Sequence, residues 1–73
     1  MFDVYFSYFD GNEYLCQNAK KITVPTVNGM KAVSGDEILN YCYRIHSEIY
    51  LHSDSVCYSI SCQNLKAIEI RKK

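Results

Sequence analysis

Apolar and polar residues alternate along most of this chain with a period of two, which is typical of β-strands that bury one face. The alternation starts in residues 2–9, where every second residue is aromatic or β-branched. It is cleanest over residues 56–62, where four apolar or aromatic residues alternate with cysteine and serine. The same pattern predicts further strands over residues 13–17, 20–24, 49–52 and 65–71.

Two dipeptides predict hairpin turns between these strands. Asp10-Gly11 and Asn28-Gly29 combine residues that readily adopt the positive φ of tight turns. We expect the first to join residues 2–9 to 13–17, and the second to join 26–27 to a short strand over 30–33.

Two single residues are expected to end strands. Asn18 is a natural corner residue after 13–17, because it tolerates left-handed geometry. Pro25 cannot donate a hydrogen bond to a neighbouring strand. The strand over 20–24 is therefore expected to end at Pro25 or to lie on a sheet edge.

The hydrophobic period changes after residue 33. Ser34 followed by Glu37 matches a capping box, in which each side chain accepts a hydrogen bond from the other residue's amide. Apolar residues then recur at helical spacing, and we predict a helix over residues 35–46. Its apolar stripe would consist of Ile38, Leu39, Cys42 and Ile45.

These elements predict an α+β fold for residues 1–73 as a single domain, with six or seven short and mostly antiparallel strands. One amphipathic helix would cover an apolar face of the sheet. A helix of about 12 residues cannot cover a wide sheet. The sheet is therefore expected to curl, or a second copy of the chain to cover what the helix leaves open.

An internal repeat is a further expectation. Residues 16–24 and 62–70 are identical at five of nine positions. Each half of the chain would then read as two or three strands, with the helix between the halves in a ββ(β)-α-ββ(β) order. Convergence of two similar turns on similar residues would explain the same match.

Charge and length exclude several classes of protein. Eight basic residues balance eight acidic ones, whereas nucleic-acid binders carry a basic excess, so a nucleic-acid partner is not expected. No apolar run approaches the ~20 residues of a membrane span, and we expect no targeting segment. We expect a cytoplasmic protein that does not bind membranes, with its four cysteines reduced.

Metal, cofactor and catalytic sites have only weak candidates. Cys42 and His46 have the i, i+4 spacing of two ligands on one helix face, but the chain lacks the paired Cys-x₂₋₄-Cys pattern of structural zinc sites. His52 and Cys57 flank a turn that contains Asp54, without a nucleophile elbow or a glycine-rich loop. Ser34-Gly35 reads as a helix cap rather than an anion site. We therefore expect no metal, no cofactor and no enzymatic activity.

Aromatic residues are the most suggestive feature of the chain. The chain has seven tyrosines and three phenylalanines. Some of them, such as Tyr5 and Phe9, are expected to point away from the buried face of their strand, and tyrosine is enriched in protein interfaces. We expect an interaction surface that draws on Tyr5, Phe9, Tyr14, Tyr41, Tyr43, Arg44, Tyr50, His52, Ser59 and Ser61.

Two functions follow as hypotheses. The first is a small, non-enzymatic protein-interaction module that binds a protein partner or forms a homodimer, by an aromatic face and by β-strand addition. Its composition suggests a viral, phage or mobile-element accessory protein that inhibits or adapts a larger host protein. The alternative is a homo-oligomer that binds a small-molecule ligand in pockets between subunits, since one chain is too small to enclose a typical pocket.

Overall fold

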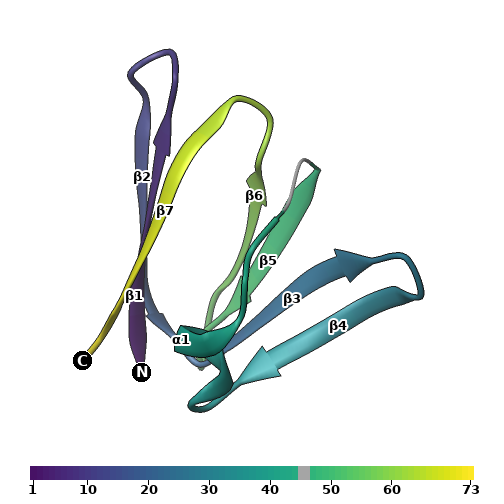
Figure 1. The fold of residues 1–73 in the computed structure, drawn as a ribbon. Coiled ribbons are helices and arrows are strands. Elements are labelled where there is room, and N and C mark those ends of the chain that lie inside the picture. Colours follow the sequence, from purple (N-terminus) through teal and green to yellow (C-terminus); the bar gives the residue numbers. More distant parts are fainter. Residues whose placement is uncertain (45–46) are drawn as a thin grey trace.

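The structure is a computed structural model that describes residues 1–44 and 47–73. It contains seven β-strands and one short helix (Figure 1). In chain order these are β1 Phe2–Tyr8, β2 Glu13–Ala19, β3 Lys21–Thr26, β4 Gly29–Ser34, α1 Glu37–Asn40, β5 Glu48–His52, β6 Cys57–Ser61 and β7 Leu65–Lys72.

The strands form two antiparallel sheets, ordered β2-β1-β7 and β4-β3-β5-β6. The prediction of mostly antiparallel short strands is therefore confirmed. The predicted α+β class overestimates the helix content. With one helix of four residues, the protein is mostly β.

The central strands join distant parts of the chain. β1 pairs with β2 on one side and with β7, from the other end of the chain, on the other. In the second sheet β5 lies between β6 and β3. The chain changes sheets after β2, where the Lys20 amide donates to the His52 carbonyl at 2.8 Å, and again at the turn between β6 and β7. This arrangement does not show an internal repeat, which stays a prediction.

The core lies between the inner faces of the two sheets. It follows the predicted alternation, because buried residues occupy alternate positions of β1, β3 and β5, apart from Tyr8 and Thr26 at the strand ends. The buried residues are Phe2, Val4, Phe6, Cys16, Ala19, Ile22, Val24, Val33, Ile38, Ile49, Leu51, Ile60 and Cys62.

The predicted helix over residues 35–46 is wrong in length. In the described part of this segment, helical structure is confined to Glu37–Asn40, and Tyr41 is extended, with φ −83° and ψ 140°. The Asn40 side-chain amide donates to the Asp36 carbonyl at 3.1 Å, and the Tyr43 hydroxyl donates to the Ile38 carbonyl at 2.8 Å. These side chains satisfy the helix carbonyls in place of further helical turns, and asparagine, tyrosine and cysteine are weak helix formers.

The capping box and the apolar stripe of that helix are also corrected. Ser34 is the last residue of β4, and the N-cap position falls on Asp36, which makes no side-chain capping hydrogen bond. Ile38 is buried as predicted, whereas Leu39 and Cys42 are exposed. Ile45 lies outside the described residues.

The segment from α1 to Tyr43 instead links the two sheets. Lys31 of β4 forms an ion pair with Glu37 (3.1 Å) and lies over the Tyr41 ring at 5.5 Å. Tyr41 and Tyr43 stack edge to face at 5.0 Å and pack against the core. Ile68 of β7 lines a small cavity together with both tyrosines, so this segment spans the distance from β4 to β7.

Asn18 does not end its strand, contrary to the prediction. It lies inside β2 at φ 60°, and the register with β1 slips there by one residue, which defines a β-bulge. The Asn18 amide donates to the Asp3 carboxylate at 3.2 Å, and its side-chain oxygen accepts from Lys73 Nζ at 2.8 Å. The left-handed conformation of Asn18 was predicted correctly, but it produces a β-bulge within β2 and does not end the strand.

Both hairpins are confirmed, with their turns one residue earlier than expected. Gly11 and Gly29 have φ of 94° and 113°, and each follows the two central residues of its turn, as in turns closed by a glycine bulge. Pro25 does not end β3, because the strand continues to Thr26. Pairing with β5 stops at Thr23, so Pro25 lies where that side of β3 has no strand partner.

Substitution of Asn64 tests the backbone conformation of the turn between β6 and β7. Asn64 has φ 61° in this turn. We expect Asn64→Gly to be more stable than Asn64→Ala by roughly 1 kcal/mol, because alanine is strained in the left-handed region, as measured by urea unfolding. The neighbouring Gln63 is the control: there Gly should be the less stable substitution, and the same order at both positions would contradict this backbone.

The four cysteines test the burial pattern. Cys42 and Cys57 are exposed, whereas Cys16 and Cys62 are buried. Burial raises the pKa of Cys16 to about 11 and also raises the pKa of Cys62, and only the thiolate reacts. At about pH 8 we therefore expect dithionitrobenzoate to label two thiols quickly and the other two only after unfolding. A Cys42→Ser, Cys57→Ser variant should lose the whole fast phase, and fast labelling of all four thiols would contradict the fold.

Candidate interaction surface

The outer face of the sheet β4-β3-β5-β6 has no other element packed on it in the described part of the chain. Strand register places its side chains in rows across the four strands, and three positions of each strand point outward. We call these twelve positions the outer face: Lys21, Thr23, Pro25, Met30, Ala32, Ser34, Glu48, Tyr50, His52, Cys57, Ser59 and Ser61.

The outer face is poor in charge. Lys21 and Glu48 are its only lysine, arginine, aspartate or glutamate residues. Its central row contains one large side chain, Tyr50, among three small ones, Ala32, Thr23 and Ser59. A flat surface of small side chains lets another surface approach closely.

The outward positions of the other sheet are different. In β1 and its neighbours, outward residues pair as Asp3 with Arg71, Tyr5 with Glu69 and Ser7 with Glu13. The Arg71 guanidinium lies over the Tyr5 ring at 5.7 Å and reaches Glu69 at 3.3 Å. That surface has the density of charge expected where a sheet faces water, and the outer face does not.

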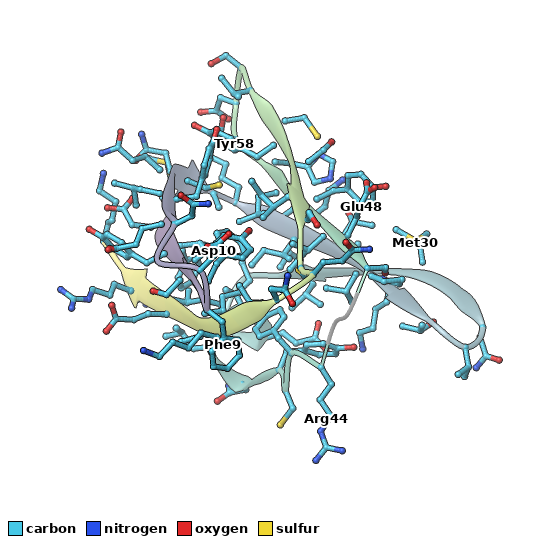
Figure 2. All side chains as sticks on the ribbon, turned by 90° about the horizontal axis from the view of Figure 1, so that it is seen from above. Phe9, Asp10, Met30, Arg44, Glu48 and Tyr58 are labelled. Atoms are coloured by element: carbon cyan, nitrogen blue, oxygen red, sulfur yellow. The ribbon has the colours of Figure 1, made fainter. Side chains whose placement is uncertain are left out.

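A free edge adjoins the outer face. β4 is the edge strand of its sheet, and β5 pairs only with residues 21–23 of β3, so the far half of the β3–β4 hairpin is a two-stranded ribbon that extends away from the body (Figure 1). Val27 at its tip is fully exposed, and Met30 is 56% exposed. Met30 projects on the same side of the ribbon as Glu48 (Figure 2). An isolated two-stranded ribbon is only marginally stable, and its apolar residues suit a partner.

The outer face also contains the candidate catalytic histidine. His52 and Cys57 are direct cross-strand partners. His52 Nε2 lies 3.1 Å from Thr23 Oγ1, whereas the Asp54 carboxylate is bound by Lys20 Nζ at 2.6 Å. Asp54 is therefore held by a lysine and does not orient the imidazole, as a nucleophile–base–acid arrangement would require.

Within residues 1–44 and 47–73, no three His, Cys, Asp or Glu side chains gather as the ligands of one metal ion would. The Cys42–His46 pair falls partly outside the described residues, because His46 is one of the two residues not described. Ser34-Gly35 precedes a helix of only four residues, Glu37–Asn40, which is too short to act as an anion site.

The structure brings together four of the predicted surface residues. Tyr50, His52, Ser59 and Ser61 all lie on the outer face. The Tyr50 hydroxyl donates to Glu48 at 3.1 Å, and this hydrogen bond is the main reason that the pKa of Tyr50 is raised.

The other predicted residues lie elsewhere. Phe9, Tyr43 and Arg44 line a cleft beside β7. Tyr5 and Tyr14 line a smaller hollow at the β1–β2 hairpin. Tyr41 packs beside Tyr43 in the segment after α1.

Sequence reasoning missed several residues of the outer face and the adjoining hairpin. Thr23 and Ala32 reach the central row only through the pairing of β3 with β5 and β4. Val27 and Met30 flank a turn dipeptide, and apolar residues beside such a polar turn were a usable signal.

Comparisons with known proteins do not identify the chain: no protein family, no curated protein and no solved structure matches it. No helix within the described ranges has the length and apolar character needed to cross a membrane. The phage origin, the inhibitory role and the cytoplasmic location stay predictions.

Tyr43 gives a pH test of the segment that links the sheets. Burial, with smaller contributions from Tyr41 and Glu37, raises the pKa of Tyr43 to about 12 from its ordinary 10.0. The folded state therefore favours the neutral hydroxyl, and the resulting stability is complete below pH 10 and is lost as the pH rises towards 12.

We expect Tyr43→Phe to be less stable than the native chain by about 1 kcal/mol near neutral pH, because the hydrogen bond to Ile38 is lost. The difference should narrow as the pH rises above 10, as measured by urea unfolding across a pH series. The remaining tyrosines are common to both proteins, so their contributions cancel. A difference that stays constant or widens would contradict the burial of this hydroxyl.

Proposed function

We propose that this protein is a non-enzymatic protein-interaction module that binds through the outer face of its four-stranded sheet. The observation that carries the proposal is the contrast between the two sheets. One exposes paired charges, and the other exposes a broad surface with a single lysine and a single glutamate among twelve outward positions. Depletion of charge marks the cores of protein interfaces.

The edge of β4 extends this surface. A partner strand added beside Gly29–Ser34 would use main-chain hydrogen bonds for affinity. Exposed Met30 and Val27 would supply apolar contacts next to that edge. Unpaired edges with apolar residues are otherwise a liability for aggregation, so a partner at this position serves stability as well as function.

The partner that we propose first is a second copy of the chain. The outer face has no net charge from Lys21 and Glu48, so two such faces do not repel each other. A symmetric dimer requires one surface that complements itself. The small side chains of Ala32, Thr23 and Ser59 in the central row would let two such faces approach closely. A larger host protein bound at the same face is the second candidate.

Lysine substitution in the central row tests the proposal. Ala32→Lys and Ser59→Lys each place a long charged side chain in the middle of the outer face. We expect the native chain to have twice the 8.5 kDa mass of one chain and each variant to have the single mass, because a buried unpaired charge is costly. Light scattering over a concentration series, with native mass spectrometry on the same samples, measures the mass of the native chain and of each variant.

Ala67→Lys is the matched control, because Ala67 is exposed and faces outward on the other sheet. It should leave the mass of the native assembly unchanged. A native chain that remains a monomer at concentrations of about 1 mM, or an equal effect of all three substitutions, would rule out the self-association that we propose.

A further inference from the structure

A cleft of about 550 Å³ opens on a different side of the molecule from the outer face. Its walls come from the β1–β2 turn, the start of β7 and the chain after α1. The residues that matter are Phe9, Tyr43, Arg44, Leu65, Lys66 and Ile68. A ligand pocket was expected only between subunits, but the volume of this cleft is already in the range of small-molecule sites on one chain.

Hydrogen bonds within the protein hold two walls of the cleft in place before any ligand binds. The Phe9 amide donates to the Asn64 carbonyl at 3.0 Å and ties the β1–β2 turn to the β6–β7 turn. The Tyr43 hydroxyl is held by the Ile38 carbonyl, so its ring is fixed in place. A preformed wall lowers the entropy that a ligand loses on binding.

The charged side chains that line the cleft are all positive. The lining includes Arg44 and Lys66 and no carboxylate. Neither cation forms an ion pair with a described residue, whereas four of the six other lysines and arginines do. In a chain of zero net charge, this local excess of positive charge favours an anion.

The apolar part of the cleft is partly aromatic. The Phe9 side chain is 73% exposed, which is unusual for phenylalanine, and it lies on the same side of the molecule as Arg44 (Figure 2). Leu65 and Ile68 add aliphatic surface. Exposed aromatic rings stack on flat ligands.

We infer that this cleft binds a small organic anion with a flat aromatic body. Its acidic group, whether carboxylate, sulfonate or phosphate, would lie between Arg44 and Lys66, and its rings would lie against Phe9 and Tyr43. The site is complete within one chain, so it does not depend on the proposed self-association.

Anilinonaphthalene sulfonate is a suitable probe, because it joins an aromatic body to one anionic group and its fluorescence reports burial. We expect saturable binding of one dye per chain. The double substitution Arg44→Gln, Lys66→Gln should weaken it by about tenfold or more, since two charge-assisted contacts are lost. Phe9→Ser should weaken it as well.

The double substitution Lys20→Gln, Lys72→Gln is the control, because it removes the same net charge at exposed positions outside both the cleft and the outer face. It should change the affinity by less than about twofold. The uncharged analogue N-phenylnaphthylamine should bind the native chain more weakly and respond little to the glutamine substitutions.

Three results would overturn the inference. They are the absence of saturable dye binding to the native, folded chain, equal weakening by both double substitutions, and binding of the uncharged analogue as tight as that of the sulfonate. Circular dichroism of each variant verifies that the dye reports on the folded state. The substituted residues are all exposed, so the fold should persist.

Discussion

The two sheets bury their apolar residues against each other in one shared core, and the remaining features depend on that packing. A chain of 73 residues buries a smaller fraction of its surface than a larger domain, so its stability margin is thin. β1 pairs with β7, and β3 pairs with β5. Each sheet therefore combines strands from both halves of the chain. Neither half can complete a sheet alone, and the fold should therefore form as one cooperative unit.

The strands could be predicted from the sequence because their pattern is local. Alternate residues face opposite sides of a strand wherever it pairs, so a local period of two was enough to predict strands over residues 2–9, 20–24 and 56–62, whose Val4, Ile22 and Ile60 lie in the core. The helix could not be predicted in the same way. Its apolar spacing was correct at Ile38, but a short helix is marginal unless packing stabilises it, and here the side chains of Asn40 and Tyr43 satisfy the carbonyls that further turns would have used.

The residues of the candidate site likewise differ in whether the local sequence could predict them. Tyr50 and Ser59 could be assigned to one surface, because they lie on adjacent strands joined by a short turn. Thr23 and Ala32 complete that row only through the pairing of β3 with β5, a contact between distant segments that no local pattern specifies. Grouping tyrosines by residue type joined Tyr5 to Tyr50, although they lie on different sheets.

The outer face and the cleft differ in what they can recognise. The outer face offers breadth, small side chains and no net charge, which suits a flat protein surface but gives a small molecule nothing to enclose it. The cleft offers a concave surface with aromatic rings and two cations that form no ion pair with a described residue, but little area for a protein partner. Because Lys66 lies on β7 in the other sheet and Arg44 lies in the chain after α1, charge in the cleft can be removed without substituting any residue of that row. Ligand binding and self-association are thus separable properties of one small fold.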